Sequence, residues 1–233
     1  MVLLVRKTMG LILSIDTGME QAGICLARDE HILGLLRNDE QKDHASWLHP
    51  AMKQIMENTG FEWQELQAIA CSAGPGSYTG LRVGMAAAKG LCYTLGIPLI
   101  LENSLKMMAL AAQQQPFSRN EYFICPMIDA RRMEVFTALF DQDLKEILPA
   151  AALILDARSF HDYLDKKPII FLGSGVAKWK AICHSPNANF ISLPFLATHL
   201  AFLAHKKFIE NQFSEIRQAE PVYLKEFYTH KKK

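Results

Sequence analysis

Ala-Gly-Pro-Gly-Ser-Tyr-Thr-Gly-Leu-Arg-Val-Gly, residues 73–84, is the stretch that decides how this chain folds. An apolar run over 66–71 precedes it, and small residues at helical spacing over 85–95 follow it. Strand, glycine-rich turn and helix predict a parallel βα unit, because glycine permits the close backbone approach that such a turn needs. Free amide groups at the start of the helix would attract an anion or another acceptor.

The segments around this unit extend the pattern on both sides. Three apolar runs come before it, at 11–15, 23–27 and 32–36, and a helical pattern follows them at 43–58, ended by Gly60. One more strand is expected after the unit, at 97–101. The first three runs are linked by short polar turns, which predicts an antiparallel meander. The order β-β-β-α-β-α-β therefore predicts a ribonuclease-H-like α/β domain.

The second half of the chain echoes the first with a strand, an acidic turn, a strand and another turn. We expect strands at 122–128, 133–140 and 169–172, a short helix at 156–164, and helices at 104–115 and 196–209. The expected domains are an N-terminal lobe over 1–105 and a smaller C-terminal lobe over 106–233, with a linker at 116–120. We expect the last helix to pack back on the first lobe.

Met9 directly precedes the first strand. We expect residues 1–8 to be a disordered or mis-called extension, and whether Met1 or Met9 is the true start stays open.

Composition narrows the function classes. The 233 residues carry a formal net charge of +1, which gives no electrostatic reason to expect binding to nucleic acid by this chain alone. The five cysteines are scattered without a C-x-x-C pair, which is typical of reduced thiols in a core. Because no apolar run reaches membrane-spanning length, we expect a cytoplasmic protein with no membrane contact.

Two acidic turns are candidate phosphate contacts. Asp16, Thr17 and Gly18 follow the first strand, where an aspartate and a glycine suit either a phosphate loop or an ordinary β-turn. At the equivalent place in the second half, Asp129 is followed by Arg131 where a phosphate loop would need glycine, so that half of a nucleotide cleft looks damaged, although the charge of Arg131 suits an anion. Gly173 and Gly175 form a further candidate contact or a plain turn.

The glycine-rich stretch does not match the common nucleotide loops, since no lysine stands where G-x-x-x-x-G-K-[ST] requires it. Its helix instead carries a nearly bare face. The residues of that face and its rim are Gly80, Arg82, Gly84, Ala87, Ala88 and Leu91. Interior glycines cost a helix about 1 kcal/mol each relative to alanine, so close packing must compensate. We expect these residues to form a partner interface. Packing of the helix on its own sheet is the alternative, and both can hold because a helix has two sides.

No catalytic constellation is complete. The histidines lack the spacing of a helical metal site, and no G-x-S-x-G stretch occurs. We therefore expect no catalytic residue, no metal site and no cofactor held by this chain.

Four segments together resemble the bacterial TsaB (YeaZ) family. They are Leu13–Thr17, Gly74–Gly84, Asp129–Arg131 followed by Glu134–Phe136, and Glu220–Lys225. Phe136 and Tyr78 stand where the family commonly has Tyr and Phe, and both are conservative changes. The resemblance covers the chain from Met9 onward.

The resemblance implies a fold with two ribonuclease-H-like lobes of the actin/Hsp70/sugar-kinase (ASKHA) type, the second reduced. It implies a non-catalytic relative of TsaD, the metal-bearing subunit. The implied partners are TsaD and the ATPase TsaE, which together transfer a threonylcarbamoyl group to N6 of the adenosine 3′ of the anticodon in tRNAs reading ANN codons. ATP and Mg would act at the level of the complex, tRNA would be met through it, and a homodimer is implied in isolation. The alternative is a stand-alone ASKHA-type ATPase or small-molecule kinase.

Overall fold

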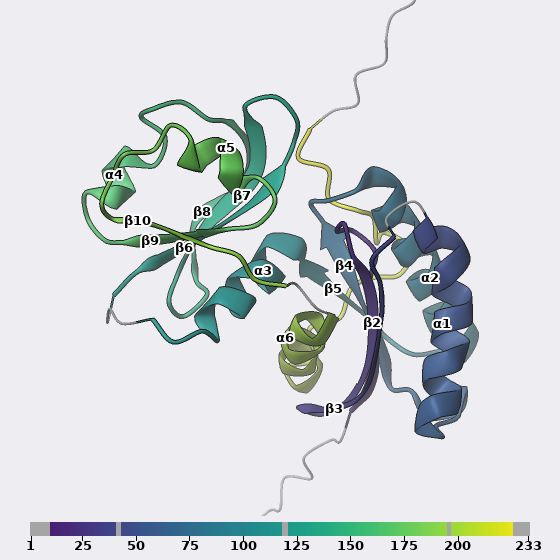
Figure 1. Ribbon diagram of the computed structural model, residues 1–233. Coiled ribbons are helices and arrows are strands. Elements are labelled where there is room, and N and C mark those ends of the chain that lie inside the picture. The colour runs from purple at the N-terminus through teal and green to yellow at the C-terminus, as the bar shows by residue number, and fades with distance from the viewer. Residues whose placement is uncertain (1–9, 41–42, 118–120, 195–196, 226–233) are drawn as a thin grey trace, which may run out of the picture. The chain divides into compact units, whose positions relative to one another are not determined.

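The computed structural model describes residues 10–40, 43–117, 121–194 and 197–225, and it contains two five-stranded sheets (Figure 1). The first sheet consists of β1 (Leu11–Asp16), β2 (Ala22–Arg28), β3 (His31–Asn38), β4 (Ala68–Gly74) and β5 (Leu99–Asn103), in the order β3-β2-β1-β4-β5. The second consists of β6 (Phe123–Asp129), β7 (Glu134–Asp141), β8 (Glu146–Ile154), β9 (Ile169–Leu172) and β10 (Ala188–Ile191), in the order β10-β9-β6-β7-β8.

The two sheets share one topology. In each, the first strand is central, pairs antiparallel with the second and parallel with the fourth: β1 with β2 and β4, and β6 with β7 and β9. The third strand continues the meander and the fifth continues the parallel part. This confirms the expected α/β class, with two ribonuclease-H-like sheets of the ASKHA type.

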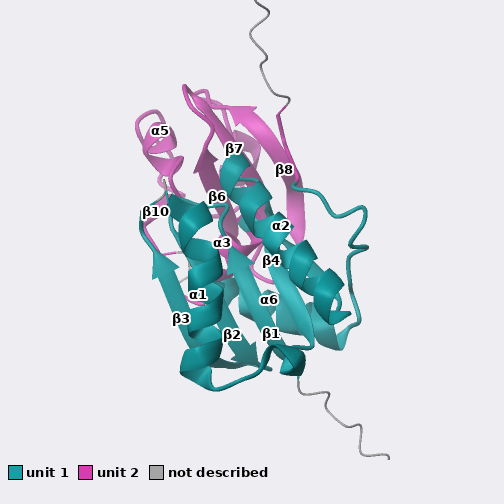
Figure 2. Cartoon of the chain, turned by 90° about the vertical axis from the view of Figure 1, so that its right-hand side faces the viewer, with its two compact units in different colours: residues 1–104, 196–221 teal, residues 105–195, 222–233 magenta. Residues whose placement is uncertain are grey.

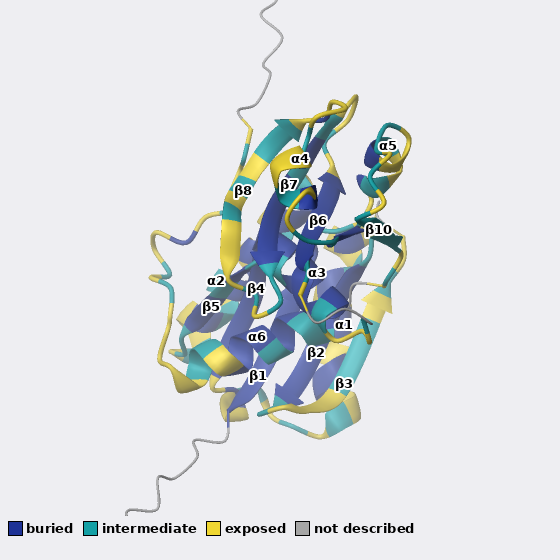
Figure 3. Ribbon diagram, turned by 90° about the vertical axis from the view of Figure 1, so that its left-hand side faces the viewer, coloured by how far each residue is buried: buried dark blue, intermediate teal, exposed yellow. Residues whose placement is uncertain are grey.

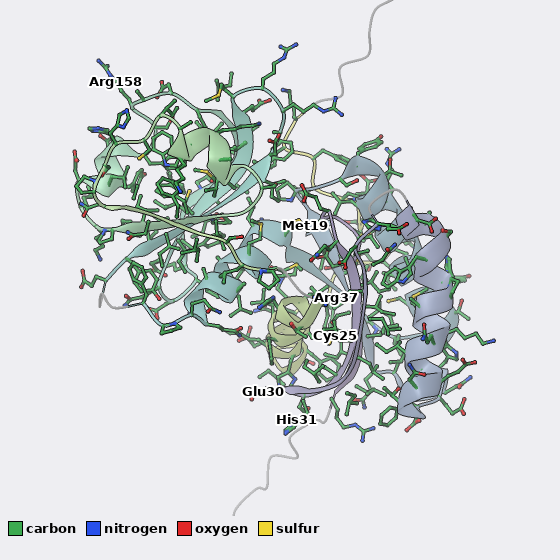
Figure 4. The ribbon with its side chains drawn as sticks, viewed as in Figure 1. Met19, Cys25, Glu30, His31, Arg37 and Arg158 are labelled. Atoms are coloured by element: carbon green, nitrogen blue, oxygen red, sulfur yellow. The ribbon has the colours of Figure 1, made fainter. Side chains whose placement is uncertain are left out.

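Helices cover both faces of the first sheet. The helices α1 (His44–Thr59) and α2 (Tyr78–Leu95) lie on one face, and α6 (Ala197–Ile209) lies on the other (Figure 1). Leu13, Ile15 and Ile69 point into the core under α1 and α2, while Cys25 of β2 packs with alanines of α6 on the opposite face (Figure 4). Because β1 is covered on both sides, all six of its residues are buried, including the polar Ser14 and Asp16.

The helix α3 (Ser104–Gln113) precedes the second sheet in the chain. Two shorter helices follow among its strands, α4 (His161–Leu164) and α5 (Val176–Lys180). An aromatic cluster fills its core, in which Phe160, Phe171 and Trp179 meet edge to face with ring centroids 5.6–5.9 Å apart. Such contacts add to the stability that burial of the rings provides.

The chain divides into two compact units (Figure 2). The first runs to Ser104 and also includes α6 and the chain that follows it up to Pro221, and the second begins at Leu105 and includes the segment from Val222. After α6, Ser214 N–H donates to Leu99 O at 2.8 Å, and the Lys89 ammonium donates to Ala219 O at 2.9 Å. Residues 210–221 are therefore hydrogen-bonded to both β5 and α2 within the first unit.

Sequence reasoning did not anticipate β8, β10 or α5, and it placed a helix over 156–164 of which the structure forms only α4. The edge strand β8 contains Pro149 and three alanines, which obscure strand periodicity, and its outward residues are exposed (Figure 3). Residues 1–8 and 118–120, expected to be an extension and part of a linker, lie outside the described residues. Within the described part of the chain, no helix has the length and apolar character needed to cross a bilayer.

Candidate functional site

The glycine-rich segment forms the turn between β4 and α2, and it packs directly onto the turn that follows β1. The Thr17 hydroxyl donates to Gly80 O at 2.6 Å, and Ser77 N–H donates to Gly18 O at 2.7 Å. A Cβ on Gly76 would overlap the Gly18 carbonyl oxygen, and one on Gly80 would overlap that of Thr17. These two glycines are therefore required for the turns to approach one another.

The helix α2 begins at Tyr78, inside the glycine-rich stretch. Ser77 is its N-cap, and its hydroxyl accepts a hydrogen bond from Gly80 N–H at 3.3 Å. Thr79, another residue type that often caps helices, lies inside the first turn. Since the Gly80 N–H binds Ser77 and the Gly80 C=O binds Thr17, the start of the helix is tied to both turns.

Asp16 is buried beneath these turns, with 4% of its surface exposed. Its Oδ1 accepts hydrogen bonds from the Ser72 hydroxyl at 2.6 Å and from Gly18 N–H at 3.1 Å. Burial raises the pKa of this carboxyl because it penalises the charged form, while the two hydrogen bonds and the His44 charge lower it by less. Asp16 thus serves as an acceptor inside the chain.

The carboxyl ends of β4 and β5 each carry one more buried polar group, at the edge where α/β sheets usually bind ligands. Ser72 already donates to Asp16. Glu102, which sequence reasoning missed, is 4% exposed and forms an ion pair of 3.1 Å with Lys207 of α6. A buried carboxylate at a strand end, followed later by a lysine in an amphipathic helix, was the available signal, but the sequence does not pair them.

The turn after β1 does not fit a nucleotide phosphate. The Gly18 N–H, which would bind a phosphate, donates to Asp16, and the Gly18 carbonyl accepts from Ser77 N–H. The Leu81 side chain fills the space beside the Gly18 Cα. The chain itself occupies the positions that a phosphate loop leaves to its ligand. The predicted residues Asp16, Thr17 and Gly18 do lie together, but as part of an internal seal.

The equivalent turn after β6 is open. The Asp129 side chain is 41% exposed and forms an ion pair of 2.8 Å with Lys178 of α5. Its Oδ1 also accepts Arg131 N–H at 2.6 Å. Slight burial works against ionisation of this carboxyl, but the Lys178 hydrogen bond and the Arg131 amide outweigh it, so the pKa of Asp129 is lowered.

Arg131 and Arg132 both adopt the left-handed backbone, with φ of 70° and 48°. Glu134 N–H donates to Arg131 O at 3.0 Å and closes the turn. Such φ values cost a residue with a side chain about 1–2 kcal/mol each and normally select glycine or asparagine. The position that sequence reasoning marked as needing glycine therefore has the backbone of a glycine and the side chain of an arginine.

Gly173 and Gly175 do not open toward a ligand. A Cβ on Gly173 would overlap Met108 and the Met127 carbonyl, and one on Gly175 would lie 2.7 Å from Val135. Their small size lets the turn after β9 pack against β6, which is the plain-turn alternative weighed from the sequence.

The bare face of α2 points inward. Gly80, Gly84, Ala87 and Ala88 are buried, and a Cβ on Gly84 would overlap the Thr17 hydroxyl. Leu91 is half-buried against the same core. Of the two interpretations left open, packing on the chain's own sheet accounts for these residues, and only Arg82 of the set is exposed.

A second small-residue stripe lies on the outward face of α2. Arg82, Ala86, Gly90 and Tyr93 recur at intervals of four, four and three, and all are exposed. A Cβ on Gly90 would meet nothing within 4 Å, and Tyr93 is 85% exposed. Sequence reasoning missed this stripe, because helical spacing alone does not show which face of a helix is left without a neighbour.

Ionisable groups elsewhere give no further centre. Among the described residues, no three His, Cys, Asp or Glu side chains gather as metal ligands would. Four cysteines are buried, and burial raises the pKa of the Cys25 and Cys125 thiols to about 12. Such thiols are poor nucleophiles at neutral pH.

Comparison with known proteins agrees with this architecture. Residues 31–191 match the family model described as "TsaD: tRNA N6-adenosine threonylcarbamoyltransferase". The chain is 29% identical over 225 residues to the "tRNA threonylcarbamoyladenosine biosynthesis protein TsaB" of Bacillus subtilis, covering 92% of this chain and 93% of that protein. The chain belongs to the TsaD family, in its TsaB (YeaZ) branch.

Two further relatives bear the same names. The Haemophilus influenzae protein named TsaB is 27% identical, with 95% of this chain and 96% of that protein covered. The crystal structure titled YeaZ from Pseudomonas aeruginosa matches with a TM-score of 0.77 and 25% identity, covering 93% of this chain and 100% of that one. The resemblance stated from four short segments thus extends over nearly the whole chain.

Proposed function

We propose that this chain is a non-catalytic, activating subunit of the complex that transfers a threonylcarbamoyl group to N6 of the adenosine 3′ of the anticodon in tRNAs reading ANN codons. The carrying observation is the seal over Asp16: the carboxylate and glycine turn that ASKHA enzymes use for phosphate are engaged by the chain's own Ser72, Ser77 and Gly80. The names of its relatives support the pathway.

The proposed partner is a TsaD-type catalytic subunit, with the ATPase TsaE joining the pair and ATP and Mg acting at the level of the complex. The outward stripe of α2 supports a close helical contact. Gly90 and Ala86 let another helix approach, while the exposed ring of Tyr93 offers the kind of aromatic anchor that interfaces favour. In the absence of the partner, the same stripe would pair with a second copy. The complex would work in the cytoplasm.

The test is assembly with a TsaD-type subunit, followed by size-exclusion chromatography with light scattering. Gly90→Leu should abolish the heterodimer without harming the fold, because its side chain enters open space and leucine favours helix more than glycine. Tyr93→Asp should weaken it independently. The matched control is Lys206→Leu, an exposed site on α6, which should assemble normally. Full assembly of both α2 variants would refute the interface.

The alternative, a stand-alone ATPase or small-molecule kinase, keeps one supporting observation: Asp16 stands at the carboxyl end of a central parallel strand. It predicts Mg-ATP turnover by the isolated chain that disappears in Asp16→Asn. The non-catalytic proposal predicts no turnover by either protein, and unchanged support of tRNA modification by Asp16→Asn in the assembled complex.

A further inference from the structure

The strongest feature outside the seal is the turn between β6 and β7, which carries Arg131, Arg132 and Met133 on an exposed tip. Neither guanidinium forms an ion pair or a ring contact with any residue that the structure describes. Two adjacent arginines without an ion-pair partner repel one another.

The nearby carboxylates are already neutralised by lysines. Asp129 pairs with Lys178, whose ammonium also donates to Glu134 O at 3.1 Å. The Glu134 carboxylate pairs with Lys225. With two carboxylates matched by two ammonium groups, the two arginines leave the turn with a local charge of +2.

The backbone makes this arrangement costly as well. Arg131 and Arg132 both have positive φ, where asparagine or glycine would fit with less strain. A sequence selected for stability alone would not place arginine at both positions. A strained conformation that keeps two charges exposed is typical of a functional contact.

Exposed apolar side chains flank the charges. Met133 is 39% exposed and Ile154 is 72% exposed. They lie on adjoining strand ends, since Leu155 N–H donates to Met133 O at 2.7 Å. The tip therefore combines two forked cations, suited to phosphate oxygens, with a small apolar surface suited to the face of a base.

We propose that this turn, through Arg131 and Arg132, contacts the phosphodiester backbone of RNA. An exposed turn can follow a polyanion along one side, whereas a free mononucleotide is normally held in a concave pocket that buries most of it. The choice of RNA as the polyanion rests on the proposed function, and the contact itself rests on the charge and geometry of the turn.

The experiment measures binding of a fluorescently labelled RNA stem-loop to the full chain across a salt series at constant pH. The double variant Arg131→Asn, Arg132→Asn should bind more weakly. The slope of log Kobs against log salt should become shallower by about 1 for each arginine removed. Asparagine tolerates positive φ, so this variant should keep its fold, which circular dichroism and thermal melting would verify.

Two controls separate this contact from general charge. Lys145→Asn with Arg158→Asn removes the same charge from other exposed sites of the second unit, where Arg158 projects outward (Figure 4), and should leave the slope unchanged. The double variant Arg131→Lys, Arg132→Lys keeps the charge and should retain most of the slope. Equal slopes for the wild type and the asparagine variant would overturn the proposal.

The assignment to RNA is overturned if Mg-ATP binds the wild type and fails to bind the asparagine variant while RNA binding is the same for both. Failure of the proposed function is detected separately, in the assembly experiment. A chain that binds RNA through this turn but never assembles with a TsaD-type subunit would refute the function and leave the contact standing.

Discussion

The turn after β1 and the turn after β6 occupy the same position in two sheets of the same topology, yet they are opposite in character. The first is closed: Asp16 is buried, and Gly76 and Gly80 let the β4–α2 turn cover it. The second is open: Asp129 is exposed, and two arginines take the place of the glycine. Two sheets of the same topology thus carry equivalent turns whose side chains differ in burial and in charge.

The largest expected effect is at Gly84. Gly84→Leu should destabilise the first unit by about 3 kcal/mol or more, because the side chain would overlap the Thr17 hydroxyl under a fully packed core. Urea denaturation would measure the change. Gly90→Leu on the same helix should leave stability unchanged or raise it. Equal stability of the two variants would contradict close packing around Gly84.

Replacing each of the two equivalent aspartates with alanine should cause clearly different losses of stability. Asp16→Ala leaves the Ser72 hydroxyl and Gly18 N–H buried without an acceptor, at a cost of about 1–3 kcal/mol. Asp129→Ala breaks a solvent-exposed ion pair and should cost less than about 1 kcal/mol. Denaturant midpoints of the two variants provide the comparison, and an equal loss would contradict the distinction between closed and open turns.

The pH dependence of stability should also differ. The pKa of Asp16 is raised in the folded chain, so the folded state holds its proton more tightly than the unfolded state, and stability falls as pH rises above the ordinary pKa of 3.8. Asp16→Asn can accept the same two hydrogen bonds without that penalty. Its stability relative to the wild type should therefore increase from about pH 4 upward. A pH-independent difference would argue against a buried, titrating Asp16.

Asp129 should show the opposite sign. Its pKa is lowered in the folded chain, so its contribution is present above the unfolded pKa and is lost as pH falls through the folded value. Asp129→Asn should accordingly lose stability relative to the wild type at neutral pH and regain parity in acid, by a small amount because the group is exposed.

The smallest effect is expected at the arginine turn. Replacing Arg131 and Arg132 with asparagine should leave stability unchanged or raise it by about 1 kcal/mol, because asparagine adopts positive φ more readily. Thermal melting would measure this. A marked loss of stability would show that the arginines support the fold, which would weaken the case for a binding role.

Much of the architecture could be predicted because the decisive signals are local. The apolar run of β1, the polar links of the meander and Gly60, which ends α1 at φ 73°, are each legible within a few residues. By contrast, β8 was missed because an edge strand tolerates Pro149 and alanines that carry no period, and β10 because four half-buried residues give too short a pattern.

The candidate residues of the site were identified better than their surroundings. Asp16, Thr17 and Gly18 do meet the glycine-rich segment, but the sequence could not tell whether a phosphate or the chain itself fills the space beside them. The bare face of α2 was likewise recognised, and its direction was not, because helical spacing defines a face without saying what it packs against.

The sequence by itself determined the β-β-β-α-β-α-β order of the first half, its partial echo in the second half, the glycine-rich turn and the family resemblance, since these depend on periodicity and on residues that few backbone conformations accept. Only the tertiary structure decided that Gly80 and Gly84 serve the chain's own core, that Gly90 and Tyr93 face outward, and that Lys178 and Lys225 leave the arginines of the β6–β7 turn uncompensated. Burial and charge pairing join residues far apart in the chain, so no local pattern could have revealed them.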